Sequence, residues 1–257
     1  MKIATFNCNS VRSRMPIILD WLARNQPDVL GLQETKCQDS DFPAGDFTNA
    51  GYCAAFRGQK SYNGVALLSR QKPSDVAFGL DDGGPADESR LIRATFGKVT
   101  VVNAYVPQGN APDAPEYAYK LEWFRRLRAY FERHFTTRRQ VAWIGDFNVA
   151  PEPMDVYDSK RLMGHVCHRP ETFAALEHVK AWGFVDVFRK HNPQPGLYSY
   201  FDYRMPKAAE RGLGWRVDHI FATPPLAARS IGAAIDMAPR LAEKPSDHTI
   251  VMAEFSE

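Results

Sequence analysis

Four short acidic clusters, far apart in the chain, each adjoin an extended apolar run, and this arrangement limits the folds that the chain can adopt. They are LGLQETK at Leu30–Lys36, WIGDFN at Trp143–Asn148, RVDHIF at Arg216–Phe221 and PSDHTIV at Pro245–Val251. Such apolar runs are typical of buried strands, and strands aimed at one end of a sheet would gather the acidic side chains there. The four carboxylates are Glu34, Asp146, Asp218 and Asp247. Crowded carboxylates need a cation, a proton or an imidazole such as His248 to compensate their charge, so the pattern indicates a functional site.

Length and hydropathy predict one globular unit. A chain of 257 residues suits a single large α/β domain, and we expect one domain over residues 1–257. No segment approaches the roughly 20 apolar residues that a membrane span needs, so no membrane contact is expected. The chain opens on the strand-like run Lys2–Asn7 rather than on a secretory signal, which favours the cytoplasm.

Cysteine usage and net charge constrain the chemistry less. Four cysteines form neither a CxxC pair nor a spaced Cys/His zinc pattern, so free thiols are expected. A net charge of +2 does not by itself predict nucleic-acid binding. Basic residues are concentrated between Lys120 and Arg139, which indicates either a binding surface or a solvated helix face.

Apolar periodicity predicts strands that alternate with helices. We expect strands at Lys2–Asn7, Asp28–Gln33, Val65–Ser69, Leu91–Phe96, Val99–Val106, Val141–Gly145, Val217–Ala222 and Thr249–Phe255. Helices are expected after Pro16 as far as Pro27, over Leu121–Phe135 and over about Glu171–Ala181. The segments Pro151–Arg169 and Asp202–Gly214 are predicted to be irregular, and long irregular loops are often functional. The pattern predicts a layered α/β fold.

The acidic clusters suit phosphodiester hydrolysis, which needs charge neutralisation at phosphate and an activated water. Glu34 at a strand end could bind Mg²⁺, a hard cation that prefers carboxylates and water. Asp146 and Asn148 are two residues apart and share one face of an extended chain, so the first could activate water and the second could orient it. The same GDFN segment also reads as an ordinary Asx turn.

The C-terminal clusters supply a candidate carboxylate–imidazole pair. Asp218 follows Arg216 on one strand face whereas His219 lies on the other, so we expect His219 to be structural. Asp218 would then orient His248 toward phosphate, and the adjacent Asp247 would contact metal or water. Near the start of the chain, Asn7 could hydrogen-bond a carboxylate or a metal-bound water.

Seven segments, taken in order along the chain, carry a resemblance to a known family. They are TFNCN at Thr5–Asn9, LQETK at Leu32–Lys36, YNGVA at Tyr62–Ala66, NAYVPQG at Asn103–Gly109, GDFN at Gly145–Asn148, GWRVDH at Gly214–His219 and SDH at Ser246–His248. The chain resembles the exonuclease III family of DNA repair enzymes within the endonuclease/exonuclease/phosphatase superfamily. The resemblance implies a four-layer α/β sandwich of two mixed β-sheets with helices packed outside. It also implies dependence on Mg²⁺, for which Mn²⁺ would substitute.

The resemblance further implies a role for each matching residue. The implied metal residues are Asn7, Glu34 and Asp247, and the implied catalytic residues are Tyr105, Asp146, Asn148, Asp218 and His248. The implied DNA contacts are Gln108, Asn110, Lys120, Arg90 and Tyr200, the last of these beside an abasic-sugar pocket. The loop Lys160–Arg169 borders that pocket in the family, and a bulky side chain there would narrow it.

The sequence therefore predicts a monomeric, Mg²⁺-dependent exodeoxyribonuclease III or abasic-site endonuclease. Its partner would be double-stranded DNA with abasic sites or damaged 3′ ends. It would cut 5′ to abasic sites and remove 3′ nucleotides or 3′-blocking groups in base excision repair. Alternatives are a 3′-processing specialist with weak abasic-site incision, a superfamily phosphoesterase with another substrate, and a non-catalytic nucleic-acid-binding regulator on the same fold.

Overall fold

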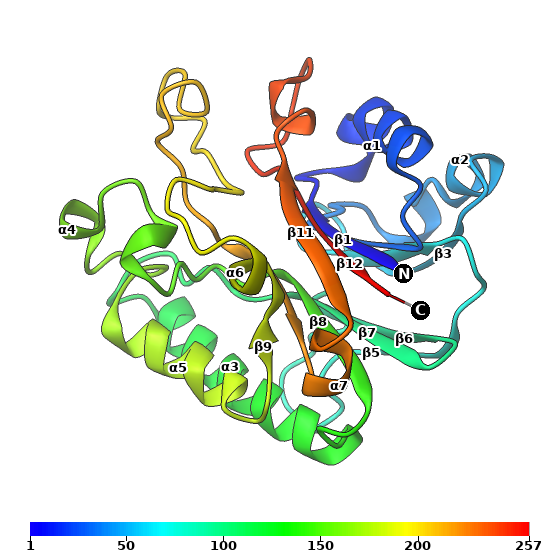
Figure 1. Ribbon diagram of the computed structural model, residues 1–257, viewed down its shortest axis with the longest axis horizontal. Helices are drawn as coiled ribbons and strands as arrows, with labels where there is room; N and C mark the ends of the chain where they lie inside the picture. Colours follow the sequence, from blue (N-terminus) through cyan, green and yellow to red (C-terminus); the bar gives the residue numbers. More distant parts are fainter. Residues whose placement is uncertain (257) are drawn as a thin grey trace.

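The computed structural model describes residues 1–256, and it contains two six-stranded mixed β-sheets (Figure 1). The first sheet has the order β11-β12-β1-β2-β4-β3. Its strands are β1 (Lys2–Asn7), β2 (Val29–Gln33), β3 (Cys53–Arg57), β4 (Val65–Ser69), β11 (Ser230–Asp236) and β12 (Ile250–Phe255). The last strand of the chain therefore lies beside the first.

The second sheet has the order β5-β6-β7-β8-β10-β9. Its strands are β5 (Ser74–Phe78), β6 (Leu91–Phe96), β7 (Val99–Tyr105), β8 (Gln140–Asp146), β9 (Val185–Asp186) and β10 (Asp218–Ala222). The two sheets face each other, with β1 and β2 packed over β7, β8 and β10.

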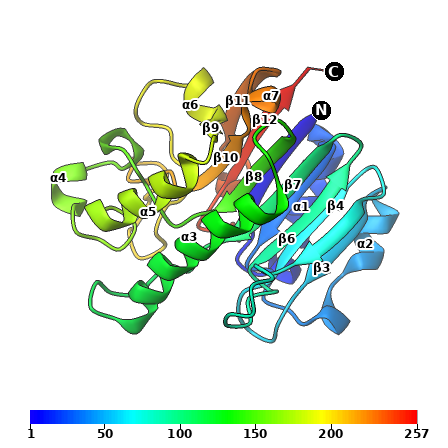
Figure 2. The ribbon, with the colours of Figure 1, turned by 90° about the horizontal axis from the view of Figure 1, so that it is seen from below.

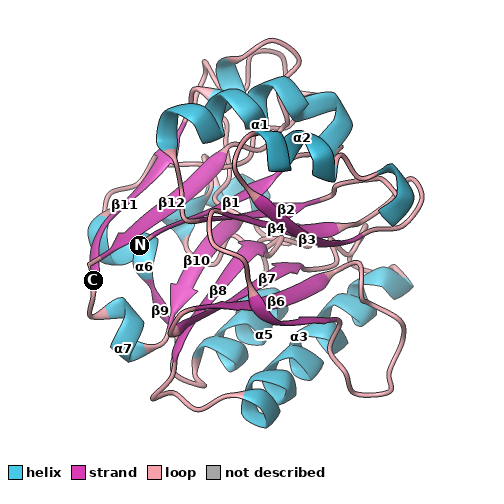
Figure 3. Cartoon of the chain, turned by 90° about the vertical axis from the view of Figure 1, so that its right-hand side faces the viewer, coloured by secondary structure: helices cyan, strands magenta, loops and turns pink. Residues whose placement is uncertain are grey.

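Helices cover the outer face of each sheet, so the molecule has four layers (Figure 3). Helices α1 (Val11–Asn25) and α2 (Ala44–Asn49) cover the first sheet, and α3 (Pro115–His134) and α5 (Pro170–Lys180) cover the second (Figure 2). The shorter helices are α4 (Ser159–Leu162), α6 (Val187–His191) and α7 (Pro224–Ala227), with 3₁₀ turns at Asp39–Asp41, Pro153–Asp155 and Pro239–Leu241. The predicted four-layer α/β sandwich is confirmed. No helix within residues 1–256 has the length and apolar character to cross a membrane.

Alternation along the strands explains the layers. In β8, Ala142 and Ile144 belong to the core between the sheets, whereas Val141 and Trp143 pack under α3 and α5. Successive strand residues point to opposite faces, so a strand covered on both faces must be apolar throughout. This is why the central strands read as unbroken apolar runs.

The first helix differs from its prediction. It begins at Val11 rather than after Pro16, because Ser10 caps it and accepts a hydrogen bond from the Ser13 backbone N–H. Pro16 lies inside the helix, where it removes one backbone donor but does not end it.

Strand directions place the acidic clusters together. β1 runs parallel to β2, and β7 runs parallel to β8, whereas β12 is antiparallel to β1 and β10 is antiparallel to β8. The carboxyl ends of β1, β2, β7 and β8 therefore lie at the same edge as the amino ends of β10 and β12. All four acidic clusters adjoin this edge.

Candidate active site

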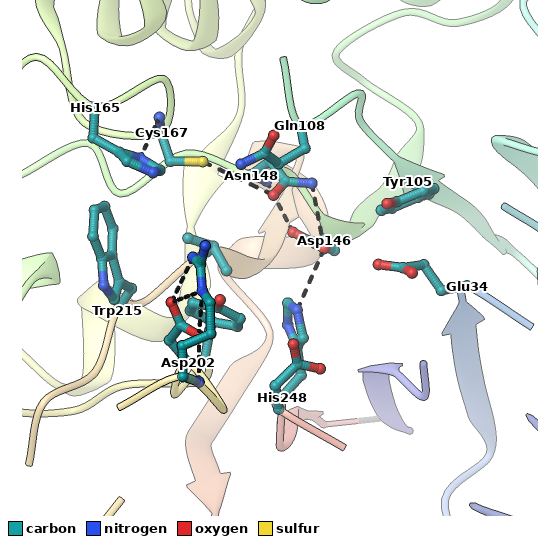
Figure 4. A pocket seen from close by; sticks show the side chains of 14 residues that line it. Glu34, Tyr105, Gln108, Asp146, Asn148, His165, Cys167, Asp202, Trp215 and His248 are labelled. Atoms are coloured by element: carbon teal, nitrogen blue, oxygen red, sulfur yellow. Dashed lines mark hydrogen bonds and ion pairs between the residues drawn. The ribbon is translucent and has the colours of Figure 1, made fainter. Parts of the chain in front are cut away.

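Asp146 lies at the centre of the site, where it ends β8. In the strand register it is opposite Tyr105 on one side and Asp218 on the other. Glu34 follows β2 in the facing sheet, and His248 precedes β12. Figure 4 shows Glu34, Tyr105 and His248 arranged around Asp146. Both sheets thus contribute to one cluster.

Asn7 joins the two sheets at this point. Its fully buried amide nitrogen donates to Glu34 Oε1 and to Asp146 Oδ2, both at 2.8 Å. Its amide oxygen accepts the Asn9 backbone N–H at 3.1 Å. Asn7 thus bridges the two carboxylates through its amide donor, and its implied metal role stays a prediction.

Glu34 is held in its ionised form. Burial alone would raise the pKa of Glu34, but Lys36 and the bond from Asn7 outweigh it and lower the pKa. The Lys36 ammonium lies 2.8 Å from Glu34 Oε2 and also donates to Asn9. Sequence reasoning assigned no role to Lys36 or Asn9, although both lie two residues from a predicted ligand.

Asp146 and Asn148 form a tight turn that also faces the site. The Asn148 backbone N–H donates to Asp146 Oδ1 at 2.9 Å, and its side chain donates to Val106 O at 3.0 Å. The segment therefore forms an Asx turn and also directs Asp146 and Asn148 toward the site. Burial raises the pKa of Asp146, and nearby Asp218 adds to this effect while His248 opposes it.

Asp218 and His248 form a buried pair. His248 Nδ1 lies 2.8 Å from Asp218 Oδ2, and His248 Nε2 lies 3.7 Å from Asp146 Oδ2. Burial would lower the pKa of His248, but the charges of Asp218 and Asp146 outweigh it and raise the pKa to about 10. Both carboxylates therefore stabilise the protonated form of the ring. Ser199, which the sequence did not single out, accepts the Asp218 backbone N–H at 3.1 Å.

A buried ionic network supports β10 from the side away from the site. Arg216 donates to Asp155 at 2.7 and 3.1 Å and to Asp186 at 2.9 Å, and its Nη1 lies 3.0 Å from His219 Nδ1. His219 Nε2 lies 2.8 Å from Val149 O. His219 is thus structural, as expected. The Arg216 side chain lies on the same side as His219 and not on the side of Asp218. Strand β10 begins only at Asp218, so the alternation of side chains along the strand does not extend to Arg216.

A cavity of about 190 Å³ opens beside the carboxylates (Figure 4). One end is lined by catalytic candidates, and the far end by His165, Cys167, Tyr200, Asp202, Arg204, Trp215 and Val217. Arg204 forms a two-pronged ion pair with Asp202, and the His165 and Trp215 rings lie 4.8 Å apart. The far end is therefore a walled, partly aromatic pocket.

The implied DNA contacts have different environments. Gln108 lines the cavity and accepts the backbone N–H of exposed Asn110 at 2.7 Å. The Tyr200 ring lies 4.9 Å from that of His248. Arg90 lies over the Tyr105 ring at 5.0 Å and donates to the Tyr105 carbonyl at 3.3 Å.

Lys120 does not have the implied role. It is fully buried, and its ammonium donates to the carbonyls of Gln108, Asn148 and Val166 at 3.2, 2.7 and 2.9 Å. All three of its protons are used within the protein, so a direct contact with the DNA backbone is wrong. Lys120 instead ties together three loops that surround the cavity.

The donor set suits a hard divalent cation. Carboxylate oxygens of Asp146 and Asp218 lie within 4.8 Å of each other, and Asn7 holds Glu34 to the same cluster. Asp218 Oδ1 is buried without a hydrogen-bond partner. Burial raises the pKa of the Cys167 thiol, so no thiolate faces the cavity. Carboxylate oxygens without a thiolate are the donors that hard divalent cations prefer.

Comparisons with known proteins agree with this geometry. Residues 4–248 match the model of the Endonuclease/Exonuclease/phosphatase family. Exodeoxyribonuclease III of Haemophilus influenzae is 34% identical over 267 residues, which span 99% of this chain and 100% of that protein. An AP endonuclease from Archaeoglobus fulgidus superposes with a TM-score of 0.98 at 49% identity, with 100% of both chains covered. The 3′ phosphatase NExo from Neisseria, in a structure bound to product DNA hairpin, gives a TM-score of 0.95 at 37% identity, again over 100% of both chains.

Proposed function

Because the chain belongs to the Endonuclease/Exonuclease/phosphatase family, we propose that it is a metal-dependent DNA repair phosphodiesterase whose bridged carboxylates and buried imidazolium perform the cleavage. One observation carries this proposal. The Glu34–Asn7–Asp146 bridge and the Asp218–His248 pair meet at the mouth of a single cavity. This geometry supports a metal site on one side of the reacting phosphate and the His248 imidazolium on the other.

Glu34 is the proposed principal metal residue, with Asp247 on the rim. A divalent cation bound there, Mg²⁺ or in its place Mn²⁺, would neutralise charge on the phosphate and on the departing oxygen. Asp247 is half-buried and accepts from Asn9 at 3.0 Å. Asn9 is thereby linked to Lys36 as well, so the rim and Glu34 share one hydrogen-bond network.

The remaining groups handle the water, the phosphate and the leaving oxygen. Asp146 accepts a proton from, or orients, the attacking water, and Asn148 holds its carboxylate in place. The His248 imidazolium binds a phosphate oxygen. Burial and the nearby Glu34 charge raise the pKa of Tyr105, so its phenol stays protonated and can donate to the departing oxygen.

The proposed substrate is double-stranded DNA that carries abasic sites or damaged 3′ ends. The enzyme would cut 5′ to an abasic site, leave a 3′-hydroxyl, and remove 3′ nucleotides or 3′-blocking groups. The walled pocket beside His248 suits a flipped sugar, because aromatic contact from Tyr200 or Trp215 needs no base-edge hydrogen bonds. We further propose that it acts as a monomer in the cytoplasm.

A second candidate function is 3′ processing with weak abasic-site incision. The observation that favours it is the lining of the far end of the cavity, which His165 and the Asp202–Arg204 ion pair border. In that case His165→Gly should raise incision relative to 3′ trimming, because it widens the wall without touching the carboxylates.

The test is a cleavage assay with Mg²⁺ on two labelled duplexes, one with an internal abasic-site analogue and one with a recessed 3′ end. We expect both to be cut, with loss of cleavage in EDTA. Trimming of the 3′ end without abasic-site incision would support the 3′ specialist. If neither duplex is cut although Mg²⁺ is present, the repair assignment is overturned.

Glu34→Gln separates an enzyme from a non-catalytic regulator. The substitution removes the charge of the proposed metal residue, so the cleavage rate should fall by about 100-fold or more, while DNA binding persists. Glu132→Gln on the exposed face of α3 is the matched control and should leave the rate unchanged. A non-catalytic regulator would show no cleavage to lose, and its DNA binding would be the same in both variants.

A further inference from the structure

A second cavity lies at the end of the sandwich opposite the carboxylates. It has a volume of about 460 Å³ and lies among β5, β6, β7, the end of α3 and the loop that leads into β8. Gln140 at its edge begins β8, and Asp146 ends the same strand. Six steps of about 3.3 Å place the two cavities roughly 20 Å apart, so one small ligand cannot span both.

The cavity is strongly basic. Its charged lining is Arg93, Lys98, Arg138 and Arg139 against the single acid Asp75. Asp75 is 63% exposed and lies 3.7 Å from Arg93. Within residues 1–256, no carboxylate lies within ion-pair distance of the other three basic groups. Four cations gathered from three segments repel one another, and an anion in the cavity would relieve that repulsion.

Buried polar atoms in the cavity wall also lack partners. Arg93 Nε and His134 Nε2 are both buried without a hydrogen bond. Leaving a buried polar group unpaired costs about 1–3 kcal/mol, so such groups usually have a bound partner. Burial, Arg93 and Arg133 lower the pKa of His134, which fits a positive local field.

We propose that this basic cavity is a second ligand site, which takes the phosphate group of a nucleotide or of free inorganic phosphate. A phosphate carries about −1.5 to −2 at pH 7 and accepts from several directions. The donors converge from three segments. They include guanidinium groups and the Thr95 and Thr100 hydroxyls, which hydrogen-bond each other at 2.9 Å and so keep one proton for a ligand.

The aromatic wall favours a nucleotide within this class. Phe135 lines the cavity, and the Arg93 guanidinium lies 5.9 Å from the centre of its ring. Base stacking on an aromatic ring contributes affinity without reading sequence. The volume lies within the range of about 300–1,000 Å³ that is typical of small-ligand sites. None of these residues belongs to the cleavage site, so this proposal does not rest on the proposed function.

Backbone amide NMR tests the proposal on the intact protein with Mg²⁺ present. Three probes are titrated separately at constant ionic strength: inorganic phosphate, 2′-deoxyadenosine 5′-monophosphate, and a cleavage-resistant phosphorothioate hexanucleotide. We expect phosphate or the mononucleotide to shift the Gly97, Lys98, Arg138 and Arg139 amides saturably, with a Kd of about 1 mM or below. Amides of Asn148 and His248 report binding at the cleavage site separately.

Arg138→Gln combined with Arg139→Gln should weaken this binding at least about tenfold. Both side chains are exposed, so the variant should fold. The charge-matched control combines Arg24→Gln with Arg125→Gln, which lie on other surfaces and should bind as the parent does. Tighter binding of the mononucleotide would show that the base contributes, and equal binding would show that phosphate alone is recognised.

Three results would overturn the proposal. One is the absence of saturable shifts at these amides up to about 20 mM of phosphate and mononucleotide. Another is a response to the hexanucleotide alone, which would indicate a nucleic-acid surface rather than a small-ligand site. The third is unchanged affinity in the Arg138/Arg139 variant.

Discussion

A single neutral side chain, Asn7, holds two carboxylates of the site in place. It donates one proton to each of Glu34 and Asp146 and adds no charge of its own. An aspartate at this position would add a third negative charge, and an aliphatic residue would remove one hydrogen-bond donor from each carboxylate. The spacing of the cluster therefore depends on an amide that itself has no reactive role.

Asp218→Asn tests the buried ion pair. Without the carboxylate charge, the pKa of His248 should fall from about 10 toward its ordinary value of 6.5, and phosphate binding by the ring should weaken at neutral pH. We expect kcat/KM to fall by about 100-fold, and histidine NMR should record the lower pKa. Asp20→Asn, on the exposed face of α1, is the control. If the cleavage rate is unchanged although the pKa of His248 is lower, His248 does not bind phosphate through its positive charge.

The sequence predicted which side chains lie together wherever a candidate residue adjoins a central strand. Glu34, Asp146, Asp218 and His248 all do, and the structure brings them together. Lys120 could not be predicted, because lysine usually faces solvent, and only the three carbonyls that converge on it explain its burial.

At the scale of the elements, the eight predicted strands are the interior strands of the two sheets. The four strands that the sequence did not predict are β3, β5, β9 and β11, and each lies at a sheet edge. Central strands are covered on both faces and need continuous apolar residues, whereas the edge strands here are short or partly exposed. The extent of burial therefore determines whether a strand can be predicted from its sequence.

Gly145→Ala tests the close approach of β7 and β8. A Cβ at Gly145 would lie 1.9 Å from the Ala104 carbonyl oxygen, and the backbone there has φ of +139°. The strands must separate beside Asp146, so we expect a loss of about 2–4 kcal/mol in unfolding free energy and reduced cleavage. Gly232→Ala is the control, because nothing lies within 4 Å of its Cβ position. Denaturant unfolding measures both, and equal stability would contradict the steric argument.

His219 should make stability depend on pH. Burial and Arg216 lower its folded pKa to about 4, against an unfolded value near 6.5, so the unfolded chain binds the extra proton between these values. The contribution, about 3 kcal/mol, is complete above pH 6.5 and is lost as the pH falls toward 4.

His219→Gln checks this dependence. Glutamine does not titrate, so the variant should lose less stability between pH 6.5 and 4.5 than the parent, by up to about 1.4 kcal/mol per pH unit. Urea unfolding at a series of pH values gives both slopes. Parallel slopes would show that His219 keeps an ordinary pKa in the folded protein.

At the scale of the whole molecule, we propose that residues 1–257 fold as one domain. The two sheets share a core, and β12 at the end of the chain pairs with β1 at its start. Unfolding followed by far-UV circular dichroism and by tryptophan fluorescence should therefore give coincident denaturant transitions. Two separated midpoints would show that the sheets unfold as separate units.

The pairing of β12 beside β1 also bears on how the protein is made. Asn7 leaves the ribosome early, but His248 and β12 belong to the last ten residues, and β12 must insert between β1 and β11 before the first sheet is complete. A nascent chain has Glu34 and Asp146 long before it has the imidazolium opposite them. The nuclease site is therefore complete only once His248 and β12 have been synthesised and β12 has inserted between its two neighbours.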